Sequence, residues 1–259
     1  MSKTTIKTLA TCLLCLLLVV ACRPAGPTTS SEIIVSAAVS LKDAFVEVAQ
    51  LNEQRNNTKV HFNFGASGAL QKQIESGAPA DVFASAGAKQ MDELAARNLI
   101  VGSTRTDFVR NVLVLVTPVN GVPVASFADL TKAEIKRIAI GNPKTVPAGQ
   151  YTEQSFNKQN LLPSIQSKLI YAEDVRQVLD YVGRGEVDAG VVYASDVLSA
   201  GAKVKEVARA TDDSHEPIVY PIAIVKDSQR QEVAQKFIDL VLSAEGQRIL
   251  AKHGFVPVK

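Results

Sequence analysis

Four short stretches of this sequence combine residues that could bind an anion. Each has a strand or loop, then small or hydroxyl residues, then the start of a helical pattern; they are residues 37–41 (AAVSL), 64–68 (FGASG), 146–149 (VPAG) and 172–175 (AEDV). The first N–H groups of a helix have no partner inside the helix, and the helix dipole adds about half a positive charge there. Such helix ends can hold an anion without a cation.

Ser40 and Ser67 are the hydroxyl residues of the first two stretches. Ser40 stands three residues before Asp43, which is the spacing of a capping box, and Gly68 after Ser67 would let a ligand come close to the backbone. A serine at a helix start is more often only a cap, and the Pro-Ala-Gly of the third stretch is more often only a turn. Taken one at a time, the stretches leave a purely structural role open.

The charge balance excludes several partners. Removing Lys3 and Lys7, which lie in the leader described below, reduces the 28 basic residues to 26 and balances the 26 acidic ones. No basic run or patch interleaved with aromatic residues indicates binding to nucleic acid. A chain without net charge that binds an anion must therefore use local dipoles.

The first residues have the pattern of an export signal. Two lysines precede an apolar stretch over residues 13–20, which is well short of the roughly 20 residues that cross a bilayer. Residues 19–22 (VVAC) resemble the lipobox of bacterial lipoproteins, which predicts a signal peptide over 1–21 and a lipid on Cys22; an ordinary signal peptide with an incidental cysteine is the alternative. We expect a location on the periplasmic or cell-surface face of the membrane, with the lipid as the only membrane attachment.

Cysteine chemistry is then excluded from the exported chain. All three cysteines lie in or next to this leader, at positions 12, 15 and 22, so only the acylated Cys22 would remain. Residues 22–31, rich in Pro, Gly, Ser and Thr, predict a flexible tether.

The rest of the chain alternates between strand-like and helical patterns. Short runs rich in Val, Ile and Phe predict strands at residues 32–37, 59–64, 81–85, 112–117, 137–140 and 188–193. Apolar residues at helical spacing predict helices at 41–51, 175–182 and 233–242. This alternation is typical of α/β folds with parallel sheets.

The order of these elements indicates two lobes. The body of about 230 residues is large enough for two small cores. We expect lobe 1 to comprise residues 32–110 plus 222–259 and lobe 2 to comprise 111–221, with chain crossings near 112–116 and 219–224 acting as a hinge. A ligand would lie in the crevice at the carboxyl ends of the strands.

Four ordered motifs give the sequence a family resemblance. They are residues 76–86 (SGAPADVFASA), 141–151 (GNPKTVPAGQY), 172–176 (AEDVR) and 190–196 (GVVYASD). Together with the serine stretches, they resemble the periplasmic molybdate-binding proteins of ABC uptake systems, from residues 37–41 to the closing HGF at 253–255. The resemblance implies a two-lobed periplasmic-binding-protein fold of type II, in which each lobe is a mixed, mostly parallel sheet flanked by helices.

The resemblance also implies a binding site between the lobes. The oxyanion would be held by the hydroxyl and N–H groups of Ser40 and Ser67, the N–H groups of Ala148 and Val175, and the hydroxyl of Tyr193. In the family the second serine often lies in a serine-rich run, whereas here Ala66 and Gly68 flank it. The protein would be a monomer that delivers molybdate or tungstate to an ABC permease. It would not be an enzyme, and it would have no cofactor and no metal site, because molybdenum binds only as the oxyanion.

Other interpretations remain open at this point. Tyr193 could be a strand tyrosine satisfied by a backbone carbonyl, and Lys42, Lys72, Lys144 and Arg176 are expected to be solvated charges that help to attract the ligand. On the same fold the cargo could be sulfate or phosphate, or, with less support, ferric iron. A hydrolase is disfavoured because no G-x-S-x-G elbow is present, and a cytoplasmic regulator is disfavoured by the export signal.

Overall fold

The computed structural model describes residues 31–258. The predicted signal peptide, Cys22 and residues 22–30 of the tether lie outside the described residues. The last residue of the predicted tether, Ser31, is the first residue of strand β1. No helix among residues 31–258 is long and apolar enough to cross a membrane.

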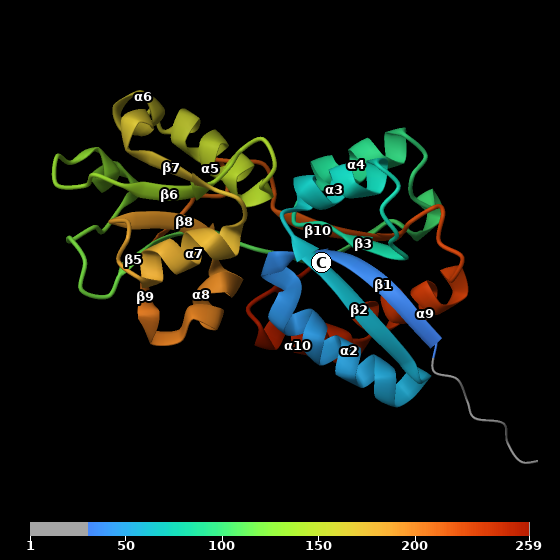
Figure 1. Ribbon diagram of the computed structural model, residues 1–259. Helices are drawn as coiled ribbons and strands as arrows, with labels where there is room; N and C mark the ends of the chain where they lie inside the picture. The colour runs from blue at the N-terminus through green and yellow to red at the C-terminus, as the bar shows by residue number, and fades with distance from the viewer. Residues whose placement is uncertain (1–30, 259) are drawn as a thin grey trace, which may run out of the picture. The chain divides into compact units, whose positions relative to one another are not determined.

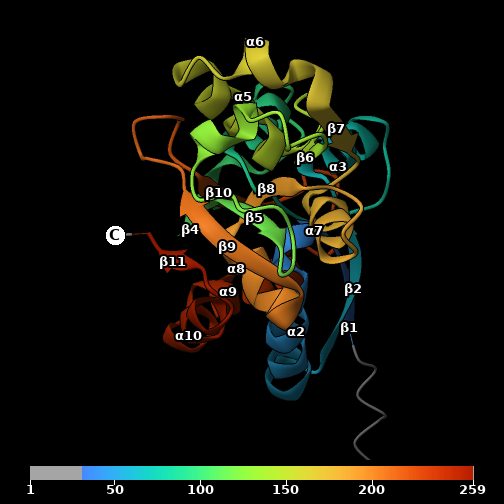
Figure 2. The ribbon, with the colours of Figure 1, turned by 90° about the vertical axis from the view of Figure 1, so that its left-hand side faces the viewer.

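The first sheet has six strands in the order β11-β4-β10-β3-β1-β2. The strands are β1 (Ser31–Ala38), β2 (Thr58–Gly65), β3 (Val82–Ala84), β4 (Thr106–Arg110), β10 (Val219–Ile224) and β11 (Val256–Pro257). Figure 1 shows α3 (Ser67–Glu75) and α4 (Ala88–Ala96) on one face of this sheet and α2 (Lys42–Asn56), α9 (Gln231–Leu242) and α10 (Ala244–Lys252) on the other. In Figure 2 the C-terminal helices lie together beside β11.

The second sheet has five strands in the order β7-β6-β8-β5-β9. They are β5 (Leu113–Pro118), β6 (Ile138–Gly141), β7 (Leu169–Ala172), β8 (Ala189–Tyr193) and β9 (Val204–Arg209). Helices α5 (Pro147–Lys158) and α6 (Leu162–Ile165) cover one face, and α7 (Val175–Gly183) and α8 (Ala194–Ala200) cover the other (Figure 1). Short 3₁₀ turns complete the body: η1 (Val39–Leu41), η2 (Gly102–Thr104), η3 (Phe127–Thr131), η4 (Gln166–Lys168) and η5 (Gly201–Lys203).

Both sheets are mixed, as expected, but parallel pairs do not dominate. Strand β1 runs parallel to β2 and β3, and β6 runs parallel to β7 and β8. The remaining pairs are antiparallel, namely β10 with β3 and β4, β11 with β4, and β5 with β8 and β9. The antiparallel strands include β5 and β10, which carry the chain into the second sheet and back into the first. A parallel neighbour in the same sheet must be reached through a crossover connection, usually a helix. Strands β5 and β10 are reached from the other sheet and need no such crossover.

Two chain segments link the sheets. One is the short connection from β4 to β5 at Asn111, and the other is the segment between β9 and β10. The backbone N–H of Asn111 donates to the carbonyl of Ile218 at 3.2 Å, so the two segments are joined to each other. The predicted second lobe boundary, between residues 221 and 222, falls inside β10, a strand of the first sheet. We therefore propose that lobe 2 ends at Ile218.

Candidate functional site

All five residues predicted to hold the ligand line one cavity. The cavity is lined by Ala38, Val39, Ser40, Gly65, Ala66, Ser67, Ala86, Val146, Pro147, Ala148, Val175 and Tyr193. These residues follow the carboxyl ends of strands from both sheets, where β1, β2, β3, β6, β7 and β8 give way to helices or turns. The two sheets thus supply opposite walls of one cavity.

The cavity is small and its wall carries no charged side chain. About 10 Å³ is open to the centre of a water molecule, which is close to the space that one bound water needs. The lining consists of small, apolar and hydroxyl residues, without Lys, Arg, His, Asp or Glu. In this closed conformation the cavity accepts only a compact ligand, and it offers that ligand neutral hydrogen-bond donors.

The starts of α5 and α7 supply backbone donors. The N–H groups of Ala148 and Val175 have no acceptor among residues 31–258. Pro147 occupies the first turn of α5, where its missing N–H costs nothing. At α7 the carboxylate of Asp174 accepts the N–H of Gln177 at 2.9 Å, which leaves the earlier N–H of Val175 free for another acceptor.

Close packing of glycines sets the position of α5. A Cβ added at Gly149 would lie 2.0 Å from the carbonyl oxygen of Gly141, the last residue of β6. Only a glycine allows the first turn of α5 to pack this closely against the end of the strand. The Ala148 N–H, one residue earlier, is thereby fixed at the cavity wall.

Ser67 lies on the cavity wall with its hydroxyl group. Its Oγ accepts the backbone N–H of Ala86 at 2.9 Å, and its side chain is buried. A serine hydroxyl has one proton to donate. Since the oxygen is already used as an acceptor of the Ala86 N–H, the proton is available to a ligand.

The expected role of Gly68 is wrong. Its N–H does not face a ligand but donates to the carbonyl oxygen of Thr145 at 2.9 Å. A Cβ at Gly68 would lie 2.5 Å from that oxygen. Gly68 belongs to α3 beside the first sheet, and Thr145 belongs to the loop after β6 in the second. The glycine therefore allows the two lobes, rather than a ligand, to approach each other.

The predicted capping box at Ser40 is also wrong. Ser40 lies inside η1, and its Oγ is 3.0 Å from the phenol oxygen of Tyr220 instead of at a helix N–H. The carboxylate of Asp43 does not reach back to the backbone either; it accepts hydrogen bonds from Arg176 at 2.8 Å and from Ser199 at 2.7 Å. Ser40 and Asp43 thus bind side chains that are distant in the sequence, instead of the backbone N–H groups that the capping-box spacing predicted.

Tyr193 is fully buried at the end of β8, and its hydroxyl stays protonated. Burial, together with the neighbouring Tyr220, raises the pKa of Tyr193 well above its usual range. Its Oη lies 3.4 Å from the carbonyl oxygen of Ala86, which is long for an O–H···O hydrogen bond. This contact agrees with the alternative of a tyrosine satisfied by a backbone carbonyl. It is also weak enough for the hydroxyl to turn toward a better acceptor in the cavity.

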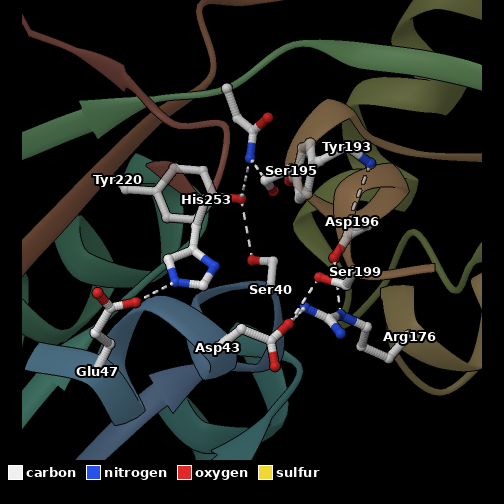
Figure 3. Close-up of polar contacts among 11 residues, drawn as sticks. Ser40, Asp43, Glu47, Arg176, Tyr193, Ser195, Asp196, Ser199, Tyr220 and His253 are labelled. Atoms are coloured by element: carbon white, nitrogen blue, oxygen red, sulfur yellow. Dashed lines mark hydrogen bonds and ion pairs between the residues drawn. The ribbon is translucent and has the colours of Figure 1, made fainter. Parts of the chain in front are cut away.

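Arg176 is not the solvated charge that we expected. Its Nε donates to the fully buried carboxylate of Asp196 at 3.0 Å, and a terminal nitrogen donates to Asp43 at 2.8 Å (Figure 3). Asp43 belongs to α2 beside the first sheet, whereas Arg176 and Asp196 belong to α7 and α8 beside the second. Together with the bond from Ser199 to Asp43, this ion pair joins the two lobes next to the cavity.

The sequence could not reveal this bridge between the lobes. Asp43 and Arg176 are 133 positions apart, and neither has a local pattern that indicates a partner. Among the lysines expected to be solvated, Lys72 is 63% exposed and pairs at 2.8 Å with Glu75 on its own helix. Lys72 therefore agrees with the expectation, and Arg176 does not.

Comparisons with known proteins place the chain in a family. The sequence pattern of the bacterial extracellular solute-binding protein family matches residues 33–256. The chain belongs to this family. Such solute-binding proteins include a putative ABC transporter substrate-binding lipoprotein of Bacillus subtilis, YvgL, which is 42% identical over 92% of this chain and 93% of its own length.

Two further relatives are informative about this solute-binding protein. The molybdate-binding protein ModA of Haemophilus influenzae is 37% identical over 87% of this chain and 90% of its own length. Among solved structures, the substrate-binding domain of a putative molybdenum ABC transporter from Clostridium difficile matches with a TM-score of 0.69 and 40% identity, over 89% of this chain and 100% of that one. The two-lobed α/β fold expected from the resemblance is confirmed.

Proposed function

We propose that this solute-binding protein captures molybdate, and tungstate equally well, and delivers it to the permease of an ABC importer. The observation that carries the proposal is a cavity between the two sheets, lined by Ser40, Ser67, Ala148, Val175 and Tyr193, which offers donors and no charge. The molybdate-binding relatives of Haemophilus influenzae and Escherichia coli support the choice of cargo.

Neutral donors are sufficient to hold a dianion. Burying a charge is costly unless hydrogen bonds compensate it, and each bond to a charged group contributes about 1.5–3 kcal/mol. The two serines would each give a hydroxyl and an N–H, Ala148 and Val175 an N–H each, and Tyr193 a hydroxyl. About seven such bonds can offset an association cost of about 4–15 kcal/mol and leave tight binding.

The donors come from both lobes, so the ligand would favour the closed form. An anion that contacts Ser40 on one side and Val175 on the other binds the closed conformation better than an open one, and it shifts the population accordingly. We infer that closure marks the receptor as loaded for the permease.

The predicted lipid anchor fits this role but depends on residues outside the described part of the chain. The lipoprotein designation of the Bacillus subtilis relative supports acylation of Cys22. The receptor would then remain on the periplasmic or cell-surface face of the membrane, next to its permease, as a monomer. Fatty-acid labelling of the native chain but not of Cys22→Ala would support the anchor, and equal labelling would contradict it.

Selectivity would follow from protonation and size. Near neutral pH phosphate keeps part of its second proton, with a pKa of about 6 as in phospho-residues, and a cavity of donors offers that proton few acceptors. Sulfate is a dianion like molybdate, so only the cavity size can exclude it. By calorimetry on the body without its leader, we expect molybdate and tungstate to bind at least about a hundredfold tighter than sulfate, a difference of about 2.7 kcal/mol. Comparable affinities would contradict the choice of molybdate and leave only the more general proposal of a site for tetrahedral oxyanions.

Two variants test whether the cavity is the site. Ser40→Ala and Tyr193→Phe each remove one hydroxyl donor, and we expect each to weaken molybdate binding by about 1.5–3 kcal/mol. Ser103→Ala and Tyr171→Phe are matched controls, because both side chains are exposed and neither residue lines the cavity. Unchanged titration curves for both cavity variants would mean that the ligand binds elsewhere.

A further inference from the structure

Ser40 is connected to a chain of buried polar side chains behind the cavity. Its Oγ lies 3.0 Å from the Oη of Tyr220 (Figure 3). The side-chain nitrogen of Asn111 lies 3.2 Å from that Oη and 2.8 Å from the Oγ of Ser195. All four side chains are buried, with Tyr220 at 0% exposure. Only Ser40 of the four lines the cavity.

The direction of these hydrogen bonds is fixed at Asn111. The backbone N–H of Val112 donates to Asn111 Oδ1 at 2.9 Å, so the amide NH₂ must be the group that faces Tyr220 and Ser195. An NH₂ group can only donate. Tyr220 therefore accepts a hydrogen bond from Asn111. Among residues 31–258 the Oγ of Ser40 is the one remaining partner of the Tyr220 hydroxyl, and we infer that it accepts the phenol proton.

This arrangement leaves Ser40 with one role. The Oγ of Ser40 accepts a hydrogen bond from the Tyr220 hydroxyl, so the hydroxyl proton of Ser40 must be donated to a different partner. Ser40 is on the cavity wall, and that partner would be the ligand. A serine without such a neighbour could instead rotate and accept a proton from the ligand.

Tyr220 is held rigidly and stays protonated. Its ring makes edge contacts with Phe108, Phe255 and Tyr193, at centroid distances of 6.5, 5.4 and 5.8 Å. Burial, with the charge of Asp196 nearby, raises the pKa of Tyr220 well above its usual range. The phenol therefore always has a proton to give to Ser40.

We propose that Tyr220 and Asn111 are positioning residues that make Ser40 an obligate donor, so that the site prefers fully deprotonated oxyanions to protonated ones. The inference rests on the proposed binding of an oxyanion at this cavity. A protonated anion such as hydrogenphosphate needs an acceptor for its O–H group. Because the hydrogen bonds from Asn111 to Tyr220 and from Tyr220 to Ser40 occupy the Ser40 oxygen, that oxygen cannot accept the proton of hydrogenphosphate.

The test is a double-mutant cycle on Tyr220→Phe and Ser40→Ala, with the affinities for molybdate and phosphate measured by calorimetry at pH 6. Tyr220→Phe keeps the ring contacts and removes only Oη. We expect it to weaken molybdate binding by up to about 10- to 100-fold, which is the value of the Ser40 bond to the anion, because the Ser40 hydroxyl is no longer held toward the ligand. In the Ser40→Ala background the same change should cost less than about threefold, because coupled residues are not additive.

The ratio of molybdate to phosphate affinity is the readout that a merely structural role would not move. We expect Tyr220→Phe to lower this ratio at least tenfold, because the freed Ser40 hydroxyl can then accept the proton of hydrogenphosphate. Asn111→Asp is a second variant: a carboxylate cannot donate, so it draws the Tyr220 proton away from Ser40 and should lower the ratio in the same direction. Tyr171→Phe, at an exposed tyrosine in β7, is the control.

The possible failures can be told apart. If the native protein binds neither molybdate, tungstate, sulfate nor phosphate, the proposed function is overturned, and this inference with it. If the native protein binds one of them but Tyr220→Phe acts additively with Ser40→Ala and leaves the ratio unchanged, the positioning role alone is overturned. If Tyr220→Phe lowers the thermal stability, Asn111→Asp is used in its place. Additivity with Ser40→Ala and the ratio of molybdate to phosphate affinity then decide in the same way.

Discussion

Replacing Gly68 by alanine is expected to weaken ligand binding about a hundredfold or more without destabilising the ligand-free protein. The added Cβ would lie 2.5 Å from the carbonyl oxygen of Thr145, a distance that atoms essentially never adopt, so the lobes could not close fully. The donors of the second lobe would then miss the anion. The loss of two bonds to a charge, at about 1.5–3 kcal/mol each, corresponds to a hundredfold or more.

The ligand-free protein is expected to lose little stability, because opening at the proposed hinge would separate Gly68 from Thr145 and relieve the clash. Gly68 is in the first turn of α3 and has no left-handed backbone angle, and alanine favours a helix by up to about 1 kcal/mol over glycine. Thermal unfolding with and without molybdate measures both effects. The matched control is Gly102→Ala, where an added Cβ meets nothing within 4 Å. If molybdate raises the melting temperature of Gly68→Ala as much as that of the native protein, the backbone at Thr145 has shifted to fit the Cβ. The contact between Gly68 and Thr145 would then not control closure of the lobes.

Replacing Arg176 by methionine is expected to cause the largest loss of folding stability. Asp196 has no exposed side-chain surface, and Arg176 is its cationic partner. Removing one member of a buried ion pair leaves an uncompensated charge and costs about 3–5 kcal/mol. We expect a loss of that size in the free energy of unfolding, measured with urea at pH 8.

The same variant is expected to recover stability in acid. Burial raises the pKa of Asp196 to about 6 even though Arg176 lowers it, and without Arg176 the pKa rises further. A carboxyl group with a raised pKa takes up its proton more readily in the folded state than in the unfolded state. The folded state therefore gains stability as the pH falls through the raised pKa toward the ordinary aspartate pKa of 3.8. The penalty of Arg176→Met is expected to be clearly smaller at pH 5 than at pH 8.

Two further variants make the Arg176 experiment specific. Arg176→Met combined with Asp196→Asn removes the unpaired charge and is expected to recover most of the stability at pH 8. Arg184→Met, at an arginine that is 67% exposed and 3.8 Å from Glu186, is expected to change stability by less than about 1 kcal/mol. An equal penalty at pH 5 and pH 8 would mean that Asp196 is not the source of the instability.

The sequence predicted those parts of the fold that have strong local patterns. The predicted strand at 32–37 corresponds to β1 (Ser31–Ala38), and the helix at 175–182 corresponds to α7 (Val175–Gly183). Strands β4, β7, β9 and β11 were missed; β7, β9 and β11 are edge strands, and their residues are mostly half-buried or exposed. One face of an edge strand and its outer side meet water, so its sequence need not be a continuous apolar run.

The five cavity residues were predicted because helix starts after strands have a recognisable pattern and because the motifs resemble a family. Their role in binding remains a proposal. The residues that support them were missed for a physical reason: Tyr220 lies 180 positions from Ser40, and Arg176 lies 133 from Asp43. Contacts of this kind arise only when the two lobes meet, and no local spacing encodes them. For the same reason, the local predictions for Asp43 and Gly68 were wrong.

The uncharged cavity wall has a consequence for the surroundings in which the protein can work. Dissolved salt screens attractions between exposed charges over about 8–10 Å at 0.1–0.15 M, but it acts much less on short contacts inside a closed cavity. The guanidinium of Arg176 beside the cavity is bound to Asp43 and Asp196. The affinity of a receptor with such a cavity for its ligand would therefore depend little on the salt concentration of the surroundings.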